Sequence, residues 1–208
     1  MYLRARTKEQ VDERKKEILD SMDALYLEKE WNDIYLKDVA KQTRISRTAI
    51  YSYYKSKEEI LLDSLYNHFI KLDDALTSLL DKELSEEELI SSISKAFEDN
   101  LIILKIMSTN LEDIERSTTL ENLVILKTEM KRFQQVFTNL LKKNFPNAKD
   151  EEIRSIIICF ITMMYGYYPL TAPIDVQKEA MKEVDAVIDI SLNELISSSL
   201  SLLFNNLK

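Results

Sequence analysis

The chain has 208 residues, of which 45% are hydrophobic and 31% charged, as is usual for a soluble globular protein. It contains one glycine and three prolines, too few turn residues for a fold rich in strands. One histidine and one cysteine leave little from which to build a histidine-based triad or a Cys/His metal site. We therefore expect an all-α protein that is not an enzyme and needs no metal or cofactor.

The net charge of −8 is unevenly distributed along the chain. Residues 1–60 carry 13 basic and 12 acidic side chains, whereas residues 61–208 carry 15 and 24. Because the acidic part would repel DNA, only the first part is expected to face a nucleic acid.

A secretory signal is not visible at the start of the sequence, and the longest apolar run, residues 156–168, is short for a membrane span of about 20 residues. We expect a buried helix there, with Cys159 as an inert core thiol, in a cytoplasmic protein without membrane contact.

Capping residues and apolar spacing predict a succession of helices. Thr7 and Gln10 have the capping-box form, which begins a first helix. Another capping box at Ser56 begins a long amphipathic helix that runs to about residue 80. The remaining helices are expected over about residues 36–43, 46–53, 86–100, 101–109, 119–144, 150–168 and 176–205. Pro169 and Pro173 are expected to bracket a loop before the last helix.

The most informative segment is residues 38–61, DVAKQTRISRTAIYSYYKSKEEIL. It can form two short helices joined by a tight turn, and every charged side chain between Asp38 and Glu58 is basic. Ser46 is a favourable N-cap that leaves the positive end of the second helix open to a phosphate. Small or apolar residues occupy the positions that would brace the two helices: Val39, Ala40, Ile45, Ile50 and Tyr54. The segment predicts a helix-turn-helix motif that binds DNA.

Several side chains of this segment are candidates for DNA contacts. Arginine binds guanine acceptors or phosphates, and the threonine hydroxyl and methyl groups suit base edges. Lys57 lies in the first turn of a helix, where its charge opposes the helix dipole unless a phosphate binds there. On the exposed face of the second helix and beside it, we expect contacts from Arg47, Thr48, Tyr51, Ser52, Tyr53 and Lys57. Near the N terminus, Arg4 and Arg6 form either a disordered basic arm or an arm that enters the minor groove.

These motifs resemble the DNA-binding domain of the TetR family of bacterial transcription regulators. The resemblance rests on residues 38–40, 43–46, 50–54 and 56–60. The start RARTKEQ and the segment GYYPLTAP at residues 166–173 are similar to one branch of that family. The resemblance implies a three-helix DNA-binding head over residues 1–56 and a helical effector-binding and dimerisation body over residues 57–208. It also implies that Tyr51 faces the groove and that Tyr53 and Lys57 hold phosphates.

Two positions depart from the pattern of the family. Arg44 replaces the glycine of the turn, and a left-handed conformation there costs a residue with a side chain about 1 kcal/mol or more. A rearranged turn is the alternative, with Arg44 gaining a phosphate contact. Tyr35 replaces the usual serine or threonine before the first helix of the motif, and its hydroxyl cannot cap that helix in the same way.

A palindromic operator requires a protein with two-fold symmetry, so we expect a homodimer. The helices predicted over residues 150–168 and 176–205 are candidates for a four-helix interface. The last helix carries a stripe of small and apolar side chains, which could instead belong to the core of one subunit. Its small and apolar residues are Val184, Val187, Ile188, Ser191, Leu192, Leu195 and Ser199.

Methionine and aromatic residues in the body either line a cavity for an apolar effector or form ordinary core. They are Met107, Met130, Phe133, Phe137, Phe160, Met164, Tyr165 and Tyr168. The expected function is that of a ligand-responsive regulator, typically a repressor, which an effector releases from its operator. The alternative is an all-helical adaptor that binds proteins and not DNA.

Overall fold

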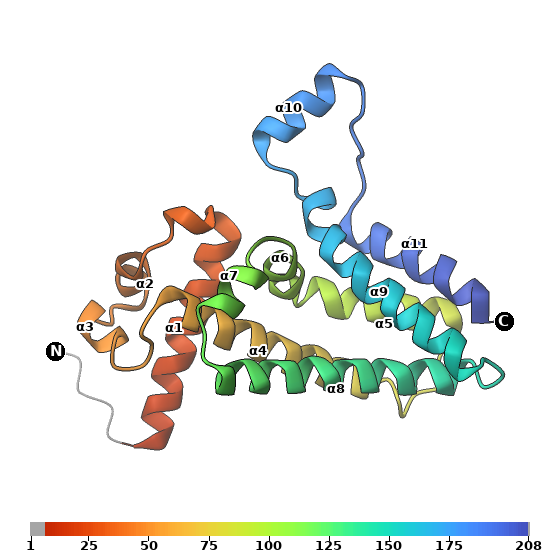
Figure 1. Cartoon of the computed structure of the whole chain (residues 1–208), viewed down its shortest axis with the longest axis horizontal. Helices are drawn as coiled ribbons and strands as arrows, with labels where there is room; N and C mark the ends of the chain where they lie inside the picture. Colours follow the sequence, from red (N-terminus) through yellow and green to blue (C-terminus); the bar gives the residue numbers. More distant parts are fainter. Residues whose placement is uncertain (1–6, 208) are drawn as a thin grey trace. The chain divides into compact units, whose positions relative to one another are not determined.

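The computed structural model describes residues 7–207. Within that range the chain forms eleven α-helices and two short 3₁₀ helices, with no strand (Figure 1). The all-α prediction is confirmed. The chain divides into two compact units, the first comprising residues 1–67 with 112–126 and the second residues 68–111 with 127–208. We call these the head and the body.

The predicted division at residue 57 falls at the start of a helix that belongs in part to each unit. The helix α4, Lys57–Thr77, begins in the head and ends in the body. The helix α8, Leu120–Asn144, crosses the border in the same way. Two helices therefore continue from one unit into the other.

The head contains the helices α1 (Lys8–Glu28), η1 (Trp31–Asp33), α2 (Leu36–Thr43) and α3 (Arg47–Ile50), together with the first part of α4 and the short α7 (Leu111–Arg116). Thr7 caps α1 through the predicted capping box with Gln10. The side chains that fill the core of the head come from every one of its longer helices: Ile18, Met22, Tyr26, Val39, Ile50, Ile60, Leu61 and Leu65. This core fixes α2 and α3 against α1, so that the outer face of α3 is free to bind.

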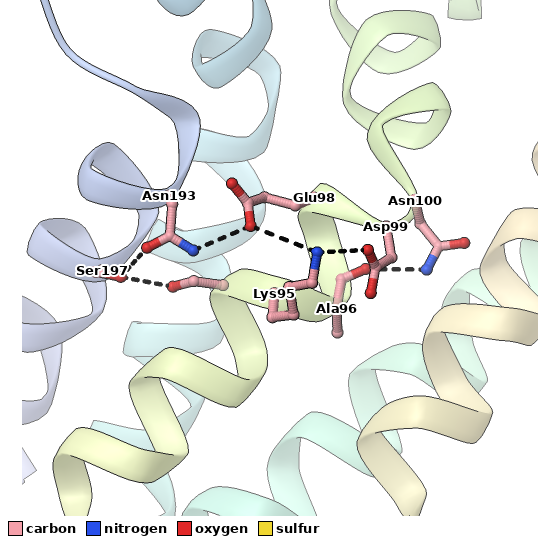
Figure 2. Close-up of polar contacts among 8 residues, drawn as sticks. Lys95, Ala96, Glu98, Asp99, Asn100, Asn193 and Ser197 are labelled. Carbon is pink, nitrogen blue, oxygen red and sulfur yellow. Dashed lines mark hydrogen bonds and ion pairs between the residues drawn. The ribbon is translucent and has the colours of Figure 1, made fainter.

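The body contains α5 (Glu86–Glu98), α6 (Leu101–Thr109), the main part of α8, α9 (Asp150–Thr171), α10 (Asp175–Glu183), α11 (Leu192–Phe204) and η2 (Asn205–Leu207). Helix α9 packs against α6 and α11, and α11 packs against α5. Figure 2 shows polar contacts that tie α5 to α11. In these contacts the Asn193 amide donates to Glu98 Oε2 at 3.2 Å, and Ser94 Oγ lies 2.9 Å from Ser197 Oγ.

The C-terminal region corrects three predictions. Helix α9 continues through Pro169 to Thr171, so the predicted loop does not begin at Pro169. The predicted helix over residues 176–205 is two helices, α10 and α11, with residues 184–191 between them. Cys159 is exposed, because the buried face of α9 is formed by Ile153, Ile156, Ile157, Phe160, Met164 and Tyr167.

The break after α10 has a local cause. Asp185 adopts a left-handed conformation with φ 52°, and the Ala186 N–H donates to the Met181 carbonyl at 2.9 Å. This is the Schellman arrangement that ends a helix. The following residues VIDI are mostly β-branched and disfavour a helix. Ser191 then begins α11 by a capping box with Glu194. The prediction of one continuous helix did not take this sequence signal into account.

Among the described helices, α9 alone has the length and composition that a membrane span would need, a property that it shares with core helices of soluble proteins. The face that it buries contacts α6 and α11.

Candidate nucleic-acid interface

The turn between α2 and α3 keeps the left-handed geometry although it carries no glycine. Arg44 has φ 58° and ψ 12°, so the rearranged turn considered above is not adopted. The hydroxyl of Thr43 stabilises the turn on both sides, because it donates to the Val39 carbonyl at 2.8 Å and accepts from the Ile45 N–H at 3.2 Å. The side chain of Arg44 is exposed and remains available to a phosphate.

Helix α3 is shorter than predicted. It begins after Ser46, whose Oγ accepts from the Ala49 N–H at 3.2 Å, as the predicted N-cap requires. Its last regular residue is Ile50, but backbone hydrogen bonds continue the turn, with the Tyr54 N–H donating to the Ile50 carbonyl at 3.0 Å. Ser52 and Tyr53 therefore lie in a helical turn just beyond α3.

The outer face of this segment brings together the side chains predicted to contact bases. Arg47, Thr48, Tyr51 and Ser52 are all exposed. Arg47 Nη2 donates to the Tyr51 hydroxyl at 3.3 Å, and the guanidinium carbon lies 5.7 Å from the centroid of the Tyr51 ring. Tyr51 is 46% exposed although it is a large ring. The pair thus presents cationic and hydroxyl donors outward from one helical face, as recognition of base edges and phosphates requires.

The inner face of the motif is fixed by apolar contacts and by a hydrogen bond from a buried tyrosine. Val39 and Ile50 are fully buried, and Tyr54 is buried with its hydroxyl donating to Asp63 Oδ2 at 2.6 Å. Burial and the bond to Asp63 raise the pKa of Tyr54, so its hydroxyl stays protonated and keeps this bond. The predicted bracing residues are confirmed as buried or half-buried.

Lys57 is engaged within the chain in a way that the sequence did not reveal. Its ammonium donates to the carbonyls of Trp31 at 2.7 Å and Ile34 at 3.0 Å, and it lies 4.0 Å from the centroid of the Trp31 ring. Burial lowers the pKa of Lys57, while Glu58 and Asp33 oppose that shift. These carbonyls relieve the conflict with the helix dipole that was expected to need a phosphate. Of the three ammonium protons, one is left for such a contact.

Tyr53 lies beside a cleft in the head. The cleft has a volume of about 410 Å³ and is lined by Lys15, Tyr53, Tyr54, Glu59, Leu62, Asp63, Tyr66, Asn122, Ile125 and Leu126. Tyr53 is half-buried in its wall, so less of the ring is accessible than in Tyr51.

Tyr35 precedes α2 without capping it through its side chain. Asp38 takes over part of that role, because its Oδ2 accepts from the Tyr35 N–H at 3.0 Å. Tyr35 is 52% exposed, with the Lys37 ammonium 4.7 Å from its ring centroid. Arg4 and Arg6 lie outside the described residues.

The predicted effector residues do not form one group. Phe133, Phe137 and Phe160 are buried and pack together, with centroids 5.8 Å apart for Phe133 and Phe137 and 5.1 Å apart for Phe137 and Phe160. Met107 and Met164 are also buried, whereas Met130 and Tyr168 are half-buried. Tyr165 is 42% exposed and does not belong to this interior cluster.

The predicted dimerisation residues are also divided. Val184, Val187 and Ile188 lie in the segment between α10 and α11 and are more than half exposed, so they form no helical stripe. Ser191 is the N-cap of α11, and Leu192, Leu195 and Ser199 are half-buried on that helix. On α9 the exposed face includes Ile158, which is 55% exposed.

Comparison with known proteins gives matches over both units. Residues 18–63 match the model described as bacterial regulatory proteins of the tetR family, and residues 65–205 match the model described as a tetracyclin repressor-like C-terminal domain. Comparison with curated protein sequences gives no match.

Solved structures share the fold at low sequence identity. A transcriptional regulator of the TetR/AcrR family from Thermobifida fusca YX-ER1 is 16% identical, with a TM-score of 0.64 and coverage of 93% of this chain and 97% of that one. The fatty acid degradation regulator FadR from Bacillus halodurans is 14% identical, with a TM-score of 0.61 and 96% of each chain covered. The transcriptional regulator FadR from Bacillus subtilis, solved in complex with stearoyl-CoA, is 16% identical, with a TM-score of 0.61 and coverage of 90% and 96%.

Proposed function

Because the chain belongs to the TetR family of bacterial regulators, we propose that it is a cytoplasmic transcriptional repressor that binds a palindromic operator as a homodimer and is released by a small-molecule effector. The observation that carries this proposal is the exposed pair of Arg47 and Tyr51 on the outer face of α3. A protein-binding adaptor would have no need of a cationic recognition face set in an acidic chain.

Specific contacts are assigned to the side chains that this face exposes. Arg47, Thr48, Tyr51 and Ser52 contact base edges or adjacent phosphates. The DNA backbone beside these bases is held by Arg44 and Ser46 in the turn between α2 and α3, and by Tyr53 and the remaining proton of Lys57 beyond α3. Arg4 and Arg6 reach the minor groove.

The dimer is formed by the outer faces of α9 and α11. Two large apolar side chains there, Ile158 and Leu202, are 55% and 70% exposed. Gly166, the one glycine of the chain, lies on α9, and a Cβ added to it would meet nothing within 4 Å. The fold of one subunit thus gives no reason for a glycine, which destabilises a helix by about 1 kcal/mol relative to alanine. A close approach of two copies of α9 supplies the reason.

The effector binds among the buried aromatic and methionine side chains of the body. The stearoyl-CoA in the Bacillus subtilis structure supports a long apolar ligand for such an interior. Since α4 and α8 continue from body to head, a ligand that shifts them changes the spacing of the two α3 helices. The ligand must then bind the free protein more tightly than the operator complex, because coupling between two sites is reciprocal.

The experiment that tests the proposal is selection of bound sequences from a random duplex pool by the purified protein. The recovered duplexes should share two inverted half-sites, with centres about 10 base pairs or a multiple of that apart. Binding should weaken steeply with salt, because each phosphate contact contributes about 0.9 to the log–log slope. Enrichment of no common sequence, with no binding in dilute buffer, would favour the adaptor.

A further inference from the structure

The segment between α9 and α11 exposes apolar side chains that no part of its own subunit covers. We call residues 172–191 the arm; it contains α10, which has no buried residue. Figure 1 shows α10 and its two connections projecting from α9 and α11. The large apolar side chains of the arm that are more than half exposed are Ile174, Val176, Val184, Val187 and Ile188. Soluble proteins rarely leave so many neighbouring apolar groups in water unless they bind another surface.

The arm is held at both of its ends. At the first end, the Ala172 N–H donates to the Tyr168 carbonyl at 2.8 Å and closes α9. At the second end, Ser191 caps α11, and the Asn193 amide ties the first turn of α11 to Glu98 on α5 (Figure 2). These contacts anchor the helices from which the arm starts and to which it returns, so the arm projects from a fixed base.

The body carries a groove with apolar and basic lining residues. This groove, between α8 and α9, has a volume of about 380 Å³, and its apolar wall consists of Ile153, Ile157, Ile158 and Ile161. Lys142, Arg154 and Asp150 also line the groove, with Lys142 paired with Asp150 at 2.6 Å, so its lining has a net charge of +1. The arm carries five acidic and two basic side chains over residues 172–191, a net charge of −3. Both the apolar groups and the charges of the arm suit this groove.

Two-fold symmetry would place the arm of one subunit near the groove of the other. When α9 packs antiparallel to its own copy, residues on opposite sides of the axis face one another. Suppose that the two copies of α9 cross at a point between Thr162 and Gly166. Thr171 at the end of one copy then lies beside a residue between Ile153 and Ile161 of the other copy. This stretch, residues 153–161, forms the apolar wall of the groove. The arm, which leaves α9 at Thr171, therefore starts next to it.

We propose that the arm reaches across the dimer and inserts its apolar side chains into the α8–α9 groove of a second copy of the chain. The arrangement is reciprocal, so each subunit donates one arm and accepts one. This inference rests on the homodimer proposed above, and it adds a contact of the arm next to the faces of α9 and α11, with Ile158 at the border between the two contacts.

Cross-linking between differently labelled subunits tests the contact directly. One subunit carries Val187→Cys in the arm, and the other carries Gln134→Cys on the α8 side of the groove, where Gln134 is exposed. Both subunits carry Cys159→Ser, and their tags differ in size. After subunit exchange and treatment with a short bismaleimide, a heterodimer band is expected. The control replaces Val187→Cys by Val124→Cys, because Val124 is also 55% exposed but lies on α8 in the head. The control should give little product; equal yields from both pairs, or none from either, would overturn the proposal.

Polar substitution measures what the contact contributes. The double variant Val184→Asn/Val187→Asn should raise the dimer dissociation constant in sedimentation equilibrium at least about tenfold. Val124→Asn should leave it unchanged, and both variants should keep the wild-type circular dichroism. A wild-type dimer whose dissociation constant is insensitive to the arm substitutions would defeat the arm contact alone. A monomeric wild-type protein would defeat the homodimer as well.

Discussion

Two surfaces of this chain carry side chains that their own subunit leaves uncovered, and their chemistry differs. The outer face of α3 presents a guanidinium, a phenol and small hydroxyls, set in a segment whose charges are all basic. The faces of α9 and the arm present isoleucine, valine and leucine, with acidic charges in the arm. Polar cationic groups suit a phosphate backbone and base edges, whereas apolar groups suit another protein surface. The type of side chain left exposed thus indicates what covers it.

The two surfaces should also respond differently to salt. Contacts between cationic side chains and phosphates release counterions, so operator binding should weaken as the salt concentration rises. Burial of apolar surface depends little on screening, so the dimer should persist over the same range. Variants that change only one of the two surfaces can therefore distinguish an effect on operator binding from an effect on dimerisation.

The largest effect on dimerisation is expected from Gly166→Leu. A Cβ added at Gly166 meets no other atom of its own subunit within 4 Å, and the position is exposed, so the fold should survive. The leucine side chain would, however, hold two copies of α9 apart. We expect a dimer dissociation constant raised about 100-fold, with operator affinity falling accordingly. Sedimentation equilibrium measures the first effect and fluorescence anisotropy with labelled duplex the second.

Gly166→Ala is the matched control for that substitution. A methyl group is small enough for close helix packing, and alanine should stabilise the helix by about 1 kcal/mol. A Gly166→Leu protein that dimerises as tightly as wild type would show that the two copies of α9 do not approach each other closely at residue 166.

A second test concerns a buried charge that belongs to neither surface. Asp73 on α4 is fully buried, and Arg132 Nε lies 3.9 Å from its Oδ2. Burial raises the pKa of Asp73 to about 7, with Glu129 adding to the shift and Arg132 opposing it. Since the folded-state pKa lies above that of the unfolded chain, the folded state holds a proton that the unfolded state has lost. Between about pH 4 and pH 7, this group should lower stability by up to about 1.4 kcal/mol for each unit of rising pH.

Asp73→Asn should therefore raise the thermal midpoint at pH 8 and change it little at pH 4, without altering dimerisation. Asp74→Asn is the control, because Asp74 also pairs with Arg132, at 3.3 Å, but is exposed. Thermal unfolding at the two pH values measures the difference. A loss of stability that is equal at both pH values would mean that the ionised carboxylate is needed in the fold.

The smallest effect is expected from Arg44→Gly in the head. Glycine adopts the left-handed conformation at φ 58° without the cost borne by arginine, so the free energy of unfolding should rise by about 1 kcal/mol. If Arg44 also holds a phosphate, the salt slope of operator binding should fall by about 0.9. Urea unfolding and binding titrations at several salt concentrations measure these two quantities. A less stable glycine variant would show that the arginine side chain contributes more than the strain removes.

The head could be predicted closely from sequence because its signals are local. Thr7 and Ser46 cap their helices as expected, and α2 spans the predicted residues. A cap and the residues within a few positions of it mark where such a helix begins, so its start can be read from a short stretch of sequence. The contact of Lys57 with Trp31 and Ile34 was missed, because it joins residues more than twenty positions apart.

The region after residue 168 was predicted less well, for an equally physical reason. Pro169 was taken as a helix end, yet α9 continues to Thr171. The apolar residues Val184, Val187 and Ile188 recur at helical spacing, but the left-handed Asp185 ends α10 before them. Exposure also depends on which neighbours a helix finds, and a periodic pattern does not specify this, as exposed Cys159 shows.

The measurement that bears most directly on the central claim is operator affinity of Arg47→Ala and Tyr51→Ala, on the duplex selected by the wild-type protein. Each substitution removes one member of the exposed pair and should cost about 1–3 kcal/mol of specific binding. Circular dichroism should remain that of the wild-type protein, because neither side chain is buried. Wild-type operator affinity in both variants would contradict the assignment of α3 as the DNA-reading element.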